Sequence, residues 1–134
     1  MSVKIDTKEK FTEIRPDAAD WTDNIAADTL EACKEVLNQP VKNLVLDLTD
    51  ITTANPTWLA NLALLQQEFY EKSASFVICC IGDALEKQLD QAELLESLHF
   101  TPTLSEAWDI VQMEEIEREL LDDGDVLFSA ENKD

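Results

Sequence analysis

Residues 41–70 read VKNLVLDLTDITTANPTWLANLALLQQEFY, and they decide the fold that the rest of the chain completes. The segment from Asn43 to Leu48 is a short run whose apolar residues fall on both faces of the pleat, which predicts a buried strand. Further on, apolar residues recur at helical spacing and form one stripe. The members of this stripe are Trp58, Leu62, Leu65 and Phe69. The segment is therefore predicted to be a strand followed by a helix.

The turn between this strand and this helix ends in an orderly helix start. Asn55 is a good N-cap, because its side chain can accept a hydrogen bond from a free backbone N–H of the first turn. Pro56 suits the first helical position, where its missing N–H costs nothing. Thr57 then falls in the first turn, with its hydroxyl near free backbone N–H groups.

The run DLTDITTANPTWLANL, residues 47–62, resembles the central motif of the STAS domain. That family includes bacterial anti-sigma factor antagonists and the cytoplasmic domains of sulfate transporters. In it, a strand ending in Asp-Leu leads into a turn made of an acid, two serines and a glycine, and then into an apolar helix. The resemblance extends over residues 3–120 as a pattern of elements, and the central motif is its specific part.

The resemblance assigns the family's positions to residues of this chain without gaps. Asp47 and Leu48 match the end of the strand, and two helix leucines of the family fall on Leu59 and Leu62. In order, the acid, the two serines and the glycine correspond to Asn55, Pro56, Thr57 and Trp58. The second serine is the phosphorylated one in the family, so the resemblance makes Thr57 the candidate phosphoacceptor.

Strands and helices alternate through the rest of the chain. Residues 3–7 and 11–15 are expected to form a hairpin, followed by a turn at Pro16-Asp17. Ser75 to Ile81 is the strongest strand signal, and a brief edge strand is expected at residues 99–101. Three further helices are expected, started by Asp20 or Thr22, by Asp83, and by Thr103 or Ser105. Their inward residues are Ala26, Leu30, Cys33 and Leu37 in the first, Leu85 and Leu89 in the second, and Leu104, Trp108, Val111, Ile116 and Leu120 in the last.

This order of elements predicts an α/β fold with parallel crossovers, in which residues 43–48 and 75–81 form adjacent, parallel strands. The resemblance implies the same order, in a STAS-like single domain with a mixed sheet of about four to five strands flanked by helices. We expect this domain to span residues 1–121, and residues 122–134 to form an acidic, weakly ordered tail.

The formal net charge is −19, which bears on the kind of partner. Such a charge argues against nucleic acid and against anionic membrane surfaces, because both would repel it. It favours a basic partner surface, although a solvated acidic surface explains it equally well. No apolar run reaches the ~20 residues of a membrane-spanning helix, so no membrane insertion is expected. Residues 1–10 are charged and polar, unlike a signal peptide, so we expect a cytoplasmic protein.

The three cysteines, Cys33, Cys79 and Cys80, make a poor disulfide framework, because their number is odd and two are adjacent within an apolar run. They are not in Cys-x-x-Cys spacing. We therefore expect all three to be small buried hydrophobic residues in a reducing compartment.

Signals of an enzyme are weak. The chain has no Gly-rich phosphate loop, no serine in a nucleophile elbow and no histidine pair with metal spacing, so we expect no catalytic residue, cofactor or metal. The lone His99, beside apolar residues, is expected to be structural. Acids at the predicted strand ends make Asp47, Asp50 and Gly82 a candidate ligand pocket.

The resemblance implies a non-catalytic regulatory protein-interaction domain, similar to an anti-sigma factor antagonist in a bacterial signalling system. Its partner would be a protein such as an anti-sigma factor or a switch kinase, and a homodimer is an open alternative. The candidate partner-binding residues are Asn55, Pro56, Thr57, Trp58 and Leu59. Thr57 is either a phosphorylation switch or only a helix-start residue, and Trp58 is either core or a partner's anchor. The alternative functions are a constitutive scaffold or assembly subunit without phosphorylation, and a small-molecule or nucleotide-sensing domain.

Overall fold

The computed structural model describes residues 2–54, 56–91, 93 and 98–132. Its main sheet has five strands in the order β1-β2-β4-β6-β7. These are β1 (Ser2–Thr7), β2 (Thr12–Asp17), β4 (Leu44–Asp47), β6 (Phe76–Cys79) and β7 (Phe100–Thr101). The first two strands are antiparallel, and every other neighbouring pair is parallel. Two short strands, β3 (Asp20–Trp21) and β5 (Thr53–Ala54), form a separate parallel pair. The predicted α/β fold with a mixed sheet is confirmed.

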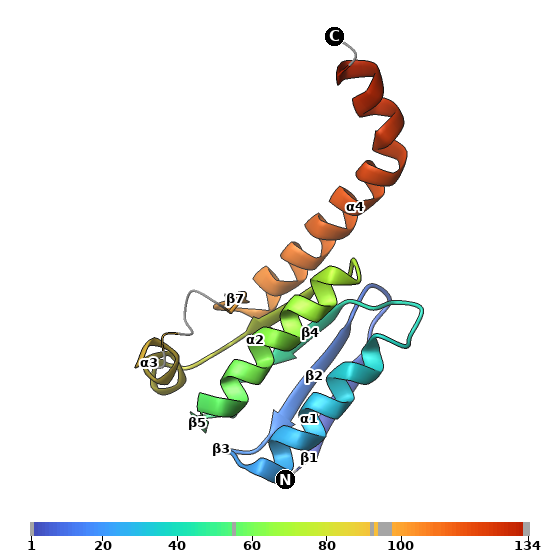
Figure 1. Ribbon diagram of the computed structural model, residues 1–134. Helices are drawn as coiled ribbons and strands as arrows, with labels where there is room; N and C mark the ends of the chain where they lie inside the picture. Colours follow the sequence, from blue (N-terminus) through green and yellow to red (C-terminus); the bar gives the residue numbers. More distant parts are fainter. Residues whose placement is uncertain (1, 55, 92, 94–97, 133–134) are drawn as a thin grey trace.

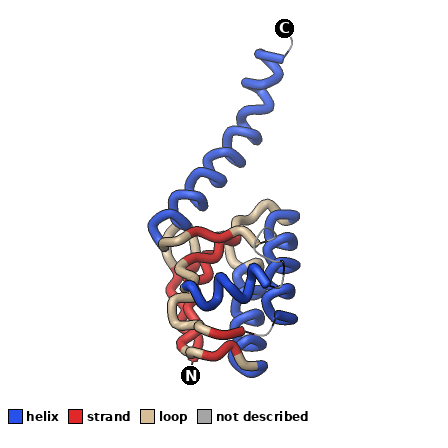
Figure 2. Tube along the Cα trace, turned by 90° about the vertical axis from the view of Figure 1, so that its left-hand side faces the viewer, coloured by secondary structure: helices blue, strands red, loops and turns tan. Residues whose placement is uncertain are grey.

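Four helices flank this sheet: α1 (Asp23–Val36), α2 (Pro56–Glu71), α3 (Asp83–Gln91) and α4 (Leu104–Asn132). The helices α1 and α2 lie side by side across one face of the sheet (Figure 1). The first turns of α4 pack on the opposite face, and the helix then continues away from the sheet (Figure 2). The sheet is thus the middle layer between two layers of helix.

The two central strands carry the core. All residues of β4 and β6 are buried, and the register runs from Leu44 opposite Phe76 to Asp47 opposite Cys79. The predicted adjacency and parallel pairing of these two strands is confirmed. Because both faces of a central parallel strand are covered, apolar residues at successive positions all gain burial.

The apolar stripe of α2 packs as its spacing predicts. Leu62, Leu65 and Phe69 are buried, and the rings of Phe69 and Phe76 meet edge-on with their centroids 5.0 Å apart. An aromatic pair in this arrangement adds to the stabilisation that burial alone provides. The contact fixes α2 against the strand that follows it in the chain.

The prediction of which residues form the inner face of α4 is wrong in part. Val111 and Ala107 are fully buried, but Trp108 is 38% exposed, and Ile116 and Leu120 are more exposed still. The inner face is occupied beyond Val111 by polar side chains, which a search for apolar periodicity assigns to the solvent side. Thr103 caps the helix as expected, because its Oγ1 accepts a hydrogen bond from the backbone N–H of Glu106 at 3.1 Å.

The polar contacts of α4 centre on Asn43, which is 5% exposed and directly precedes β4. Its Nδ2 donates to the Lys10 backbone oxygen at 3.0 Å and to Glu115 Oε2 at 2.8 Å. Its Oδ1 accepts hydrogen bonds from the Ser75 backbone N–H and from Arg118 Nη2, both at 3.1 Å. One side-chain amide therefore joins the β1–β2 hairpin, the start of β6 and the helix α4.

Three smaller expectations need correction. Pro16-Asp17 is not a turn but the end of β2. The strand β4 pairs only with residues 12–14 of β2, so at Pro16 no strand of the sheet lies on the β4 side. The missing N–H of the proline is tolerated there. Asp83 is the first residue of α3, and Gly82 takes the cap position, since its oxygen accepts a hydrogen bond from the Glu86 N–H. Thr22, the N-cap of α1, makes no side-chain capping bond.

In the described part of the chain, none of the helices combines the length and the hydrophobicity needed to cross a bilayer. The helix α4 extends through Gly124 to Asn132. The expected weak order of residues 122–134 stays a prediction.

The Asn43→Ala substitution tests the role of the amide. It leaves the buried Ser75 N–H and partly buried groups of the hairpin and α4 without their partner, so we expect it to lower the free energy of unfolding by about 2–4 kcal/mol. Urea denaturation measures this. Asn38→Ala, in the exposed turn that follows α1, is the control, and its effect should stay within about 0.5 kcal/mol. Equal effects of the two substitutions would show that the network does not hold the fold.

Candidate functional site

The candidate site lies at the start of α2, on a turn that is fastened to the preceding part of the chain. The Thr52 backbone N–H donates to the Ala19 oxygen at 2.7 Å, and Thr53 Oγ1 donates to Asp20 Oδ1 at 2.6 Å. These bonds accompany the parallel pairing of β3 with β5. The helix start is therefore presented from a fixed turn rather than from a free loop.

The helix α2 begins at Pro56, as the sequence predicts. The predicted N-cap, Asn55, lies outside the described residues. Thr57 is exposed, which confirms its predicted solvent accessibility. Its position in the first turn of a 16-residue helix places the hydroxyl where the helix dipole favours negative charge.

Trp58 combines the two roles that the sequence left open. Its side chain is half-buried and packs against the main core, while its Nε1 donates to Asp23 Oδ1 at 2.8 Å. This bond holds the indole between the first turns of α1 and α2. The indole also lines a groove of about 340 Å³ between these helices. The other lining residues are Leu30, Lys34, Asn61, Leu64, Leu65 and Glu68.

Leu59 is 1% exposed, so its side chain belongs to the core and does not reach a partner directly. It can support a docking surface only by fixing α2. Among the candidate residues whose side chains the structure describes, the accessible ones are thus Thr57 and the exposed part of Trp58. Asp23 is a further member that sequence reasoning missed, because no periodicity signals a bond between residues 35 positions apart.

The candidate ligand pocket of Asp47, Asp50 and Gly82 stays a prediction, and the structure places its three residues as follows. Asp47 is buried at the end of β4, whereas Asp50 pairs with Arg15 through Oδ2 and Nη2 at 3.1 Å. Gly82 is exposed ahead of α3. Asp47 instead lies beside Cys79 and Cys80. A cavity of about 670 Å³ beside α2 is lined by other residues, which include Tyr70 and His99.

The surroundings of His99 are those of a structural residue. Its Nδ1 lies 3.0 Å from the Tyr70 hydroxyl oxygen, and its backbone N–H donates to Gln66 Oε1 at 2.9 Å. The Tyr70 hydroxyl donates to Glu114 Oε1 at 2.9 Å. Burial, followed by the charge of Glu114, raises the pKa of Tyr70 well above its ordinary value, so the hydroxyl stays protonated. These hydrogen bonds connect His99, which directly precedes β7, with α2 and α4.

A strand ending in Asp47-Leu48, the fastened turn and the exposed Thr57 at the start of an apolar helix form one continuous arrangement. The family model of the STAS domain matches residues 7–107. The chain belongs to the STAS domain family. No curated protein matches this STAS domain in sequence.

Solved structures share the fold at low sequence identity. An anti-sigma factor antagonist assigned in Thermotoga maritima superposes with a TM-score of 0.71 and 16% identity, over 82% of this chain and 94% of that chain. An anti-sigma factor antagonist from Mycobacterium paratuberculosis superposes with a TM-score of 0.65 and 21% identity, over 83% of this chain and 93% of that chain. The anti-sigma factor antagonist SpoIIAA, in its unphosphorylated form, superposes with a TM-score of 0.65 and 10% identity, over 83% of this chain and 96% of that chain.

The Trp58→Phe substitution tests whether the indole fixes the start of α2. It removes the N–H that Asp23 accepts while keeping the aromatic contact, so we expect a loss of about 1 kcal/mol in the free energy of unfolding. Trp108→Phe, on the exposed side of α4, is the matched control and should change it by less than about 0.5 kcal/mol. Urea denaturation followed by circular dichroism gives both values. Indistinguishable losses would contradict a specific role for the Trp58–Asp23 bond.

Proposed function

We propose that this STAS domain is a non-catalytic regulatory protein-interaction domain of the anti-sigma factor antagonist type, in the cytoplasm of a bacterium. Its docking surface is the start of α2 with the neighbouring turn of α1. Thr57 is the switch of this surface. The observation that carries the proposal is the exposed Thr57 side chain in the first turn of α2, at the position where the family carries its phosphorylated serine.

The electrostatics of the helix start support the switch. A phosphoryl group on Thr57 adds about two negative charges, which the positive end of α2 and its free backbone N–H groups stabilise. Pro56 removes one of these N–H groups but also fixes the backbone of the turn. The added charge repels an acidic contact surface, and it disfavours an apolar one because the phosphoryl group would lose its hydration there.

The shape of the surface supports a protein partner. The half-buried Trp58 and the strongly exposed Leu64, 65% accessible, both line the groove between α1 and α2. Lys34 and Glu68 also line the groove and supply polar contacts. An aromatic anchor with apolar and polar neighbours is the usual composition of an interface hot spot. An anti-sigma factor or a switch kinase is the kind of partner that this proposal names.

A constitutive scaffold of the same fold would use the same surface without modification. Phosphorylation separates these two functions, because only the switch requires a kinase that recognises Thr57. Intact mass spectrometry of the protein from its native host is the direct measurement. A species heavier by one phosphoryl group, mapped to Thr57, supports the switch.

The binding test compares partner capture from host lysate by wild type, Thr57→Glu and Trp58→Ala. We expect both substitutions to weaken capture of the same partner, the first by burying a charge in the interface and the second by removing the anchor. Thr57→Glu should leave the free energy of unfolding almost unchanged, since a negative charge in the first turn of a helix is mildly favourable.

The matched control is Ser105→Glu, which places the same charge at the second position of α4, on a different surface. Capture by this variant should equal that of wild type. Undiminished capture by Thr57→Glu and Trp58→Ala would show that the start of α2 is not the docking surface. Weakening by Trp58→Ala alone would favour the constitutive scaffold.

A further inference from the structure

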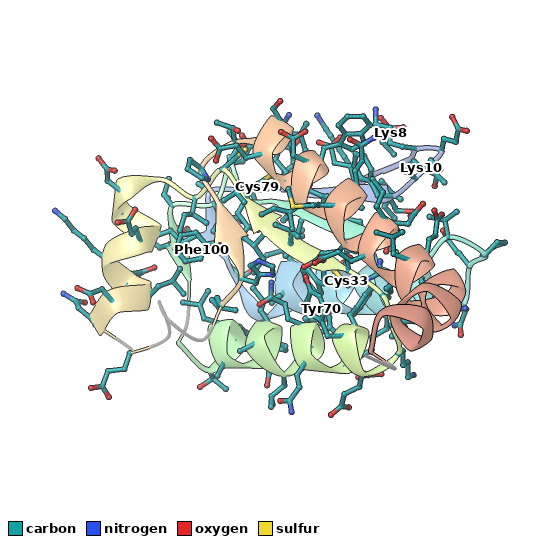
Figure 3. The ribbon with its side chains drawn as sticks, turned by 90° about the horizontal axis from the view of Figure 1, so that it is seen from above. Lys8, Lys10, Cys33, Tyr70, Cys79 and Phe100 are labelled. Atoms are coloured by element: carbon teal, nitrogen blue, oxygen red, sulfur yellow. The ribbon has the colours of Figure 1, made fainter. Side chains whose placement is uncertain are left out.

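The ends of β4 and β6 bring together three potential metal ligands that lie outside the docking surface. Asp47 pairs with Cys79 in the register of the two strands, and Cys80 follows directly. One carboxylate oxygen of Asp47 and the Sγ atoms of both cysteines all lie within 4.8 Å of one another. The two Sγ atoms are 3.4 Å apart. Figure 3 shows Cys79 on the α4 side of the sheet, away from Cys33.

The backbone of Cys80 explains how two adjacent cysteines share one side. Successive residues of a strand point to opposite faces of the sheet. Cys80 has a φ of 65°, in the left-handed region that a residue with a side chain seldom adopts. This departure coincides with the end of β6 and with the close approach of the two sulfur atoms. Backbone strain of this kind concentrates at functional sites.

The carboxylate of Asp47 is held in place by its own loop. Its Oδ1 accepts a hydrogen bond from the Thr49 backbone N–H at 2.9 Å and another from the Thr49 hydroxyl. Hydrogen bonds from neighbouring groups orient the ligands of metal sites and are part of such sites. The buried carboxylate is thus fixed beside the two thiols before any ion arrives.

The surroundings of the thiols are negative. The carboxylate of Asp47 lies against both thiols, and Glu13 is a further acid whose charge acts on Cys79. The nearby Arg15 is paired with Asp50 at 3.1 Å. The electrostatics of this cluster therefore favour the binding of a cation over that of an anion.

The spacing of the sulfur atoms suits a metal better than a disulfide. Two thiolates on a tetrahedral Zn²⁺, each at about 2.3 Å, lie about 3.8 Å apart, close to the present separation. A disulfide usually joins Cα atoms about 4.4–6.8 Å apart, whereas adjacent residues with a trans peptide hold them about 3.8 Å apart. The chain has no cis peptide bond among its described residues.

We propose that Asp47, Cys79 and Cys80 form a binding site for one thiophilic divalent cation of the Zn²⁺ class, with water completing the coordination. Two thiolates and one carboxylate match the ligand preferences of Zn²⁺. Binding releases the thiol protons, so affinity rises with pH.

The test uses the full-length, tag-free protein, reduced with a phosphine and stripped of metal. Cd²⁺ is titrated while the thiolate-to-cadmium absorption is followed in the ultraviolet, and Zn²⁺ binding is measured by calorimetry. We expect one equivalent of either ion to bind, with the absorption of two thiolate ligands and a rise in the melting temperature. The absence of saturable binding would overturn the proposal.

Cys80→Ser and Asp47→Asn should each weaken Zn²⁺ binding at least about tenfold, the loss typical even for groups that only support a ligand. Cys80→Ser should also halve the Cd²⁺ absorption. Both variants keep Cys79, whose buried side chain the fold needs. Cys33→Ala, on the other face of the sheet, is the control and should bind as wild type does. Unchanged binding by Cys80→Ser or Asp47→Asn, or a loss confined to Cys33→Ala, would disprove the site.

Discussion

The buried amide of Asn43 is the contact on which the arrangement of this STAS domain depends. Its oxygen accepts a hydrogen bond from the backbone N–H of Ser75, the residue directly before β6. Its nitrogen donates to the backbone oxygen of Lys10, in the hairpin of β1 and β2. It also bonds Glu115 and Arg118 of α4. A buried polar network specifies one arrangement when all its members are satisfied, because any other arrangement leaves a buried group unpaired. The amide therefore fixes both the order of the strands at this end and the line along which α4 leaves the sheet.

The attachment of α4 determines how one face of the sheet is covered. Its apolar contact comes from Leu104, Ala107, Ile110 and Val111, and polar contacts attach it further along the helix. Two helices cover the other face with continuous apolar stripes, so that face is committed to the core. The α4 face holds a smaller buried cluster, which includes Cys79, and Asp47 and Cys80 lie beside Cys79 at the ends of β4 and β6. The two faces of the sheet thus differ in the size of the apolar core that they cover.

Sequence periodicity predicts the parts of this fold that burial controls. The strands around Leu46 and Val77 and the stripe of α2 follow from apolar patterning alone, because each residue's place is set by its own transfer from water. The inner face of α4 could not be predicted, since Glu114, Glu115 and Arg118 are polar and a bond between residues 72 positions apart leaves no local signal. The Trp58–Asp23 bond could not be predicted for the same reason. The positive φ of Cys80 could not be predicted because a residue with a side chain seldom adopts it. The place of Thr57 in the first turn of α2 could be predicted because helix starts carry a local signal, whereas its assignment as the candidate phosphoacceptor comes from the resemblance to the STAS motif.

The proposed docking surface and the thiol–carboxylate cluster lie at the two ends of the connection between β4 and α2, and separate hydrogen bonds hold each of them. Within the loop between β4 and α2, Thr49 holds Asp47, whereas Thr53 holds Asp20 beside the helix start. Leu48 and Ile51 lie between these two anchors, and each is 1% exposed. Moving one anchor relative to the other would require these side chains to leave a close-packed core, which costs more than a local charge change supplies. A cation at Asp47 and a phosphoryl group at Thr57 should therefore act independently, so that each can be measured in a protein that lacks the other.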